Sequence, residues 1–323
     1  MTRSKKSRQG VSVDDLVDRA RKGDPRAVAR LISLVEDASP LLREVSAGLA
    51  PYAGNAQIVG ITGPPGVGKS TSTSALVATL RKTGQRVGVL AVDPSSPFTG
   101  GALLGDRVRM QDHATDPEVY IRSMATRGHL GGLAWATPQA LRVLDAAGCD
   151  VILVETVGVG QSEIAIAGQA DSTLVLMSPG MGDGIQAAKA GILEIGDIYV
   201  INKADREGAN QVRREIRTML SLAERDEGDW RPPIVQTVAI KSEGIDEVVE
   251  KLSDHRAWLS ESGELQRRRV RRARDEIETI AVTSLRSRFA DLHGDERLDE
   301  LAEAVITGQS DPYAAADQLV ASM

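Results

Sequence analysis

A glycine-rich segment that ends in a lysine and a serine carries the strongest chemical signal in the sequence. Residues 63–70 read Gly-Pro-Pro-Gly-Val-Gly-Lys-Ser and fit the pattern G-x-x-x-x-G-K-[S/T]. In such a loop the backbone N–H groups surround a polyphosphate, Lys69 supplies positive charge to the β- and γ-phosphates, and the hydroxyl of Ser70 is a ligand for Mg²⁺. The loop lies between a predicted strand at 57–62 and a predicted helix at 69–82, which favours a phosphate-binding loop over a plain glycine turn. The predicted phosphate-binding residues are Gly63, Pro64, Pro65, Gly66, Val67, Gly68, Lys69, Ser70 and Thr71.

A second motif, Asn-Lys-Ala-Asp at residues 202–205, follows the apolar run 198–201. The carboxylate of Asp205 can accept hydrogen bonds from N1–H and the exocyclic amine of guanine, whereas adenine presents a lone pair there and has no such amine. Leaving a buried carboxylate unpaired costs roughly 1–3 kcal/mol, so the motif favours GTP over ATP. The stem of Lys203 can lie along the base, and Asn202 is expected to tie this loop to the phosphate loop. The motif is short, and by itself it also fits an ordinary turn after a strand.

The end of the next apolar run, 234–238, is a candidate to contact the opposite edge of the guanine base. Here a backbone N–H can contact guanine O6. The candidate residues are Thr237, Val238 and Ala239.

An acidic residue at the end of another strand could serve the metal ion. Glu155 follows the apolar run 151–154, and Gly158 lies three residues further on, where its N–H can reach the γ-phosphate. With Lys69, these two are candidate catalytic residues. The next residue is Val159, in place of the glutamine that positions the attacking water in some GTPases, so we expect slow intrinsic hydrolysis.

Two aspartates bracket a segment rich in Gly, Pro and Ser. Asp93 and Asp106 enclose it after the apolar run 87–92. A loop of this length inside a compact domain is usually functional, so both carboxylates are candidates to reach Mg²⁺ through water, and Asp106 is a fourth catalytic candidate. Each of them also fits a capping or turn residue.

Short apolar runs that alternate with helical stretches must position these residues. This alternation predicts an α/β fold with a mostly parallel sheet covered by helices on both faces. Residues 1–53 are predicted to form an N-terminal helical extension, 54–262 the nucleotide-binding domain, and 263–323 a C-terminal helical region. A run of arginines within 267–274 fits either a solvated helix face or a basic contact surface.

The composition excludes several classes of protein. The 323 residues are 41% hydrophobic with a net charge of −6, which disfavours a nucleic-acid binder. One cysteine excludes an internal disulfide framework, and the four histidines show no metal-ligand spacing. No apolar run approaches the roughly 18 residues that a membrane-spanning helix needs. We expect a cytoplasmic protein without membrane or nucleic-acid partners.

Together these motifs resemble the metallochaperone branch of the P-loop GTPases. Within that branch the sequence is similar to the GTPases associated with methylmalonyl-CoA mutase, also called the ArgK or LAO/AO transport ATPase family. The resemblance covers roughly residues 12–310. The segments that carry it are 63–71, 92–96, 104–110, 155–163, 179–194 and 202–205.

The resemblance implies a GTP-hydrolysing regulator of an adenosylcobalamin-dependent methylmalonyl-CoA mutase, one that gates cofactor loading and protects the mutase. It implies GTP or GDP with Mg²⁺, the acids Asp93, Asp106 and Glu155 at the metal and switch regions, and a homodimer formed through the C-terminal helices. It also implies that 179–194 is a switch that communicates with the mutase. The candidate switch residues are Asp183, Gln186 and Lys189.

Other interpretations stay open at this point. From its residues alone, 179–194 is a glycine-rich loop entering an amphipathic helix, and a plain helix cap would fit it equally. A P-loop kinase or ATPase acting on a transport protein or small substrate is an alternative function, although no acceptor base can be picked out. A metal-insertion GTPase is another, although such proteins usually carry His or Cys clusters.

Overall fold

The computed structural model describes residues 12–93, 110–113, 115–125, 136–156, 162–180, 194–224, 226–289 and 296–321. The chain divides into two compact units, one up to Arg269 and one from Val270 onwards. The first unit contains the sheet and the sequence motifs.

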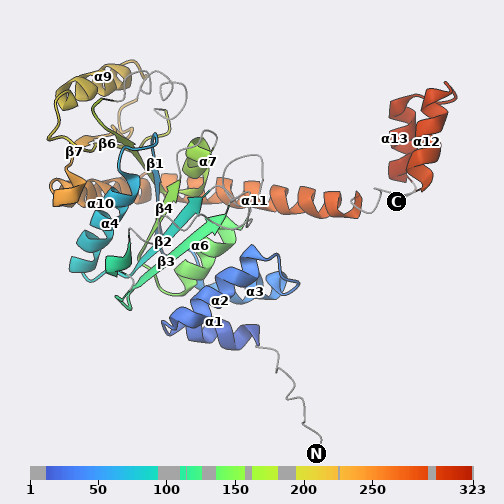
Figure 1. The fold of residues 1–323 in the computed structure, drawn as a ribbon, viewed down its shortest axis with the longest axis horizontal. Helices are drawn as coiled ribbons and strands as arrows, with labels where there is room; N and C mark the ends of the chain where they lie inside the picture. Colours follow the sequence, from blue (N-terminus) through green and yellow to red (C-terminus); the bar gives the residue numbers. More distant parts are fainter. Residues whose placement is uncertain are drawn as a thin grey trace, which may run out of the picture. The chain divides into compact units, whose positions relative to one another are not determined.

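A seven-stranded sheet forms the centre of the first unit, in the order β3-β2-β4-β1-β5-β6-β7 (Figure 1). Every neighbouring pair is parallel, which confirms the predicted fold class. The strands are β1 (Gln57–Thr62), β2 (Val87–Asp93), β3 (Val119–Ala125), β4 (Val151–Thr156), β5 (Ser172–Met177), β6 (Ile198–Ile201) and β7 (Ile234–Gln236).

Alternating side chains of the central strands enter two separate cores. In β4, Val151 and Leu153 belong to the core under α4 (Lys69–Lys82) and α10 (Ile245–Glu261). Ile152 and Val154 belong to the core under α6 (Thr137–Ala146) and α7 (Ser162–Gln169). Because successive side chains of a strand point to opposite faces, a strand that is apolar throughout must be covered on both sides, as Figure 1 shows.

A third core lies beneath α9 (Ala209–Ser221), which covers the β6 and β7 end of the sheet. Val212 and Ile216 of this helix are buried, one turn apart, against Tyr199 and Ile201 of β6. The arginines between them on the helix remain outside this core.

Three short helices precede the sheet: α1 (Val13–Arg21), α2 (Pro25–Glu36) and α3 (Leu42–Leu49). The carboxylate of Asp24 caps α2 by accepting from the N–H groups of Arg26 and Ala27, at 2.8 and 3.4 Å. The apolar faces of the three helices join the core that contains α6.

The long helix α11 (Glu264–Phe289) begins in the first unit and continues into the second, which also contains α12 (Glu296–Ile306) and α13 (Pro312–Ala321). Two arginines of the basic run hold the start of α11 within the first unit: Arg268 donates to both carboxylate oxygens of Asp197, each at 3.0 Å, and Arg269 donates to Asp171 at 3.3 Å. For Arg268 and Arg269 the interpretation as a solvated helix face is wrong, because both side chains are engaged with carboxylates. Among the described helices, none is long and apolar enough to cross a membrane.

Candidate functional site

The loop between β1 and α4 lies at the carboxyl end of the central strand. Its glycines Gly66 and Gly68 have φ angles of 79° and 94°, a region that favours glycine. A Cβ on Gly68 would also lie 2.5 Å from Nδ2 of Asn202, so the close approach of the two loops requires glycine here. The first N–H groups of α4 face this loop, because a helix leaves its first N–H groups without intrahelical partners.

Lys69 is buried, with 7% of its surface exposed, and its ammonium group is folded back over the loop. Nζ donates to the carbonyl oxygens of Gly63 and Pro64, at 2.6 and 3.1 Å. These bonds hold the charge next to the backbone N–H groups at the start of α4. Positive charge, N–H donors and a helix N-terminus therefore converge at one place, which is an arrangement that binds phosphate.

Glu155, the penultimate residue of β4, reaches the same helix. Ser70 donates to Oε1 of Glu155 at 2.6 Å, and the hydroxyl of Thr73 lies 3.1 Å from Oε2. Both hydroxyl residues and Glu155 are buried. The sequence did not single out Thr73, although its position three residues after Ser70 places both hydroxyls on one face of the predicted helix.

The side chain of Asn202 joins three loops. Its amide nitrogen donates to the carbonyl of Val67 at 2.8 Å, and its Oδ1 accepts from the backbone N–H of Ala239 at 3.0 Å and from the hydroxyl of Thr237 at 3.3 Å. The expected tie between the Asn202–Asp205 loop and the phosphate loop is thus confirmed. Lys203 adds a second tie, since its Nζ donates to the carbonyl of Gly66 at 2.7 Å.

Asp205 lies at the more open end of this arrangement, with 45% of its side chain exposed. Its carboxylate is 3.6 Å from Nζ of Lys241, which follows the Thr237–Ala239 segment. The N–H of Ala204 donates to the carbonyl of Thr237 at 3.0 Å. Asp205 and the Thr237–Ala239 segment therefore lie on adjoining loops, as contacts to two edges of one base require.

The family model "Methylmalonyl Co-A mutase-associated GTPase MeaB" matches residues 28–293. The chain belongs to the MeaB family of P-loop GTPases. As a member of that family it is a GTPase.

Relatives and solved structures agree with the assignment to the MeaB family. A relative from Pyrococcus abyssi is 51% identical over 311 residues, which cover 95% of this chain and 96% of the relative. The mouse protein "Methylmalonic aciduria type A homolog, mitochondrial" is 37% identical over 267 residues, 81% of this chain and 64% of the mouse protein. The crystal structure of an LAO/AO transport system kinase superposes with a TM-score of 0.71 at 28% identity, over 97% of this chain and 98% of the other.

Several residues predicted for the MeaB-type site lie outside the described residues. They are Asp106, Gly158, Asp183, Gln186 and Lys189. Asp93 ends β2, next to the carboxyl end of β4, but its side chain is also outside the described part. The structure therefore brings together the phosphate loop, Glu155 and the two base loops. Within the described residues, no group of three or more His, Cys, Asp or Glu side chains could hold a metal ion by itself.

Proposed function

We propose that the chain binds GTP across the carboxyl ends of β1 and β6, with the phosphates on the loop of residues 63–71 and the base on the loop of residues 202–205. The observation that carries this proposal is the pair of ties from Asn202 to Val67 and from Lys203 to Gly66. Because these bonds join the two loops directly, they define a single separation between the phosphate cradle and the base contacts.

The proposed roles follow from the donors and acceptors at each place. Backbone N–H groups from Gly66 to Thr71 bind the phosphate oxygens, and Lys69 neutralises their charge. Asp205 accepts from guanine N1–H and the exocyclic amine, and the N–H groups near Ala239 face O6. Lys241, 3.6 Å from Asp205, helps to hold that carboxylate in place.

The residues around Ser70 fit Mg²⁺. Hydroxyl and carboxylate oxygens are the ligands that this cation prefers, and Ser70 Oγ and Glu155 Oε1 are only 2.6 Å apart. Ser70 would hold the ion, with Glu155 as its anionic neighbour, and Asp93 and Asp106 stay candidates for the same site. When bound, Mg²⁺ would neutralise negative charge on the phosphates.

We infer that hydrolysis by the chain alone is slow and that a partner stimulates it. The reason is Val159, which follows Gly158 and cannot orient a water molecule for attack. The family description and the name of the mouse relative support an adenosylcobalamin-dependent methylmalonyl-CoA mutase as that partner. On this proposal GTP controls loading of the mutase with its cofactor, residues 179–194 transmit the nucleotide state, and the chain acts as a homodimer.

Replacing Asp205 tests the guanine site. In Asp205→Asn the amide carbonyl still accepts from N1–H, but its NH₂ group opposes the exocyclic amine of guanine and matches the O2 oxygen of xanthine. We expect GTP affinity to fall by roughly a factor of ten or more and XTP affinity to rise. Competition with a fluorescent GDP analogue measures both. Asp246→Asn, an exposed change at the start of α10, is the control, and unchanged selectivity in Asp205→Asn would exclude the assignment.

Phosphate release with and without a purified mutase tests the partner. We expect the methylmalonyl-CoA mutase of the same organism to raise GTP turnover roughly tenfold or more, and to leave ATP turnover unchanged. Lys69→Ala should abolish the stimulated rate. If the mutase neither changes the rate nor forms a complex that survives gel filtration, the partner proposal fails while the GTP-binding proposal stands on the preceding test.

A further inference from the structure

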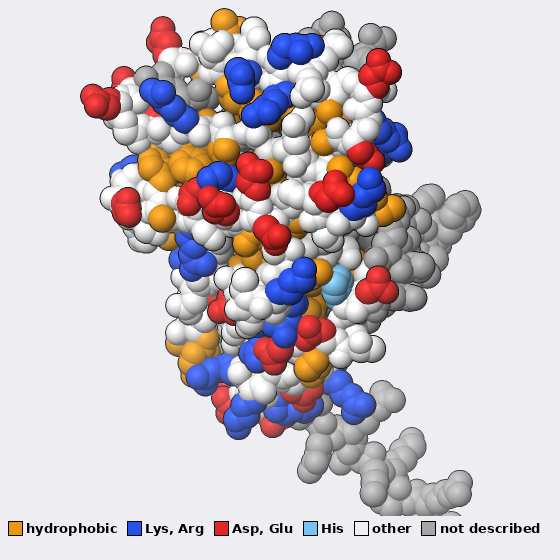
Figure 2. Space-filling model, turned by 90° about the vertical axis from the view of Figure 1, so that its left-hand side faces the viewer, with side chains coloured by type: hydrophobic (Ala, Val, Ile, Leu, Met, Phe, Trp, Pro, Cys, Tyr) orange, Lys and Arg blue, Asp and Glu red, His pale blue; other side chains and the backbone are white. Residues whose placement is uncertain are grey.

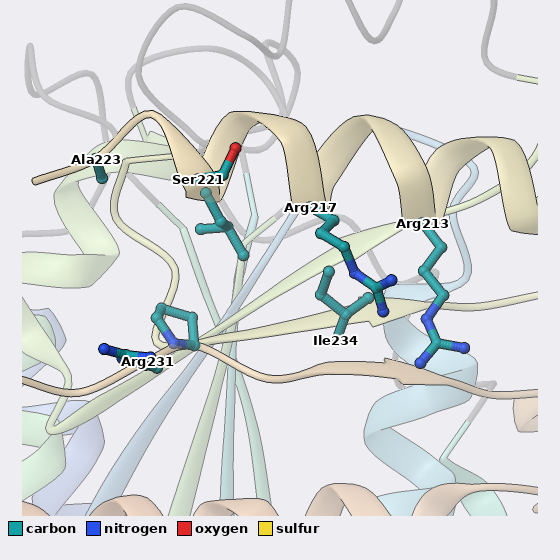
Figure 3. A pocket seen from close by; sticks show the side chains of 8 residues that line it. Arg213, Arg217, Ser221, Ala223, Arg231 and Ile234 are labelled. Carbon is teal, nitrogen blue, oxygen red and sulfur yellow. The ribbon is translucent and has the colours of Figure 1, made fainter. Parts of the chain in front are cut away.

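A pocket of about 520 Å³ lies between α9 and the segment that leads into β7. Three arginines line it: Arg213 and Arg217 from α9, and Arg231 from the opposite segment (Figure 3). Arg213 and Arg217 are four residues apart on the helix, so they share one face, and Figure 3 shows both side chains extending toward β7. Among the described residues that line the pocket, none is acidic.

The three guanidinium groups have no anionic partner among the residues that the structure describes. None of them takes part in an ion pair there, and Nε of Arg213 is buried without a hydrogen-bond partner. Some other arginines of the first unit are paired with a carboxylate, as Arg81 is with Asp116 at 2.8 Å and Arg86 with Glu118 at 2.6 Å. The cluster around Arg213 therefore lacks the counter-charge that Arg81 and Arg86 have.

This concentration of positive charge runs against the net charge of the chain, which is −6. In Figure 2, several Lys and Arg side chains lie at the end of the visible face that carries α9, and others are spread over the rest of that face. Like charges four residues apart on one helix face repel one another, so an anion that enters the pocket relieves the repulsion between Arg213 and Arg217 and gains charge-assisted hydrogen bonds. A guanidinium group binds phosphate or carboxylate through two parallel N–H groups.

The remaining lining residues indicate the chemical character of the part of the ligand that the arginines do not contact. Leu220, Pro232 and Ile234 present apolar surface beside the arginines. A volume of about 520 Å³ lies within the range of about 300–1,000 Å³ that is usual for small-molecule sites. We propose that this pocket binds a small organic molecule that carries two or more phosphate or carboxylate groups, with Arg213, Arg217 and Arg231 as its anion-binding residues.

The position of the pocket connects it to the base loops. The helix α9 begins at Ala209, four residues after Asp205, and β7 ends at Gln236, directly before Thr237. A ligand held between α9 and β7 would thus contact the two elements that carry the base-binding loops, while it stays clear of the phosphate loop. It is a second site, and it does not depend on the mutase proposal.

Isothermal titration calorimetry on the full chain tests this proposal. The protein is saturated with GDP and Mg²⁺ beforehand, so that the phosphate loop does not compete. The probes are 2,3-bisphosphoglycerate, which bears phosphates, and propane-1,2,3-tricarboxylate, which bears only carboxylates. The variants are Arg217→Gln and Arg231→Gln, both at exposed positions. Arg214→Gln is the matched control, because it removes the same charge from the same helix but does not line the pocket.

We expect at least one probe to bind with one molecule per chain, and the tighter of the two identifies the preferred anionic group. Each pocket variant should weaken that binding about tenfold, and the control should change it less than about twofold. Equal weakening in Arg214→Gln, or no saturable binding of either probe, would overturn the proposal. Tighter binding of a hexaglutamate peptide with the same dependence on Arg217 would overturn it in favour of a protein-docking surface.

Discussion

At the scale of single residues, Asn202 shows how one amide can hold a nucleotide site together. Its NH₂ group and its oxygen are both engaged, and its partners Val67 and Ala239 are buried. The amide uses both of its functions, and a carboxylate at this position could not replace the donor. This explains in physical terms why the motif begins with asparagine.

Removing this amide should destabilise the protein before any nucleotide is bound. In Asn202→Ala the carbonyl of Val67 and the N–H of Ala239 lose their partners, at about 1–3 kcal/mol for each buried group. We expect the free energy of unfolding, measured by urea denaturation of the nucleotide-free protein, to fall by roughly 3 kcal/mol. GDP affinity should fall as well.

The exposed Asn210, which lies 3.4 Å from Gln236, supplies the control for this experiment. Asn210→Ala removes the same group from a solvated position and should change the free energy of unfolding by less than about 0.5 kcal/mol. If the two variants were equally stable, the side chain of Asn202 would not be what joins the loops.

At the scale of elements, α10 and the start of α11 meet the sheet at a polar, buried contact. His255 of α10 is fully buried, its Nδ1 lies 2.8 Å from the Ser172 hydroxyl, and its ring is stacked on Trp258. The carboxylate of Asp197, which also forms an ion pair with Arg268, lies 3.4 Å from Nε2 of His255. The contact therefore joins α10, α11 and the sheet around one imidazole.

Burial lowers the pKa of His255 to about 4, against the pull of Asp197 in the opposite direction, and the charge of Arg268 adds to the lowering. The unfolded chain takes up this proton below pH about 6.5, whereas the folded protein resists it until pH about 4. The free energy of unfolding therefore has its full value above pH 6.5 and decreases as the pH falls toward 4. Between pH 6.5 and pH 4, this group changes the free energy of unfolding by about 3 kcal/mol.

Replacing this histidine should remove that part of the pH dependence. In His255→Gln, which keeps a hydrogen-bonding group near Ser172, we expect a smaller loss of stability between pH 7 and pH 5.5 than in the wild type. Urea unfolding at the two pH values measures the difference. An unchanged slope in His255→Gln would contradict the assignment.

The same scale shows what the sequence could and could not reveal. The predicted strand 57–62 and helix 69–82 agree with β1 and α4, because an uninterrupted apolar run and a glycine-rich turn are strong local signals. The strand β3 was missed, since it forms an edge of the sheet and its Ile121, Arg122 and Ser123 are only half-buried. An edge strand does not need an apolar run, so its sequence resembles a loop.

In the site, the local motifs were predictable from the sequence, whereas the contacts between distant segments were not. The spacing of the two nucleotide motifs located the loops, because each motif is local in sequence. The approach of Thr73 to Glu155 spans 82 residues of sequence, and the arginine pocket combines a helix with a loop beyond it. Contacts of this kind depend on tertiary packing, and no local pattern reports them.

At the scale of the whole molecule, the second unit exposes apolar side chains that the chain itself leaves uncovered within its described residues. Ile277, Ile280 and Leu285 of α11 are exposed by 67%, 55% and 53%. Full burial of such a side chain is worth about 1.5–3 kcal/mol, so a partner surface would stabilise this helix substantially. The proposed homodimer supplies such a surface from a second copy.

Charge placed on this face should therefore separate the dimer. For Ile277→Glu combined with Ile280→Glu, we expect light scattering to give the single-chain mass of 34.4 kDa, and the wild type to give twice that mass. Thr279→Glu adds a negative charge at an exposed position of the same helix and should leave the mass unchanged. A monomeric wild type, or a double variant that remains dimeric, would count against the proposal.

The strand β7 has a consequence for how copies of the molecule can associate. It is the last strand of the sheet, it has three residues, and Pro232 and Pro233 come directly before it. Proline has no backbone N–H, so this edge of the sheet offers few hydrogen-bonding groups with which a strand of another molecule could pair. Even at high concentration the protein is thus protected here against runaway strand addition, the first step toward fibrils.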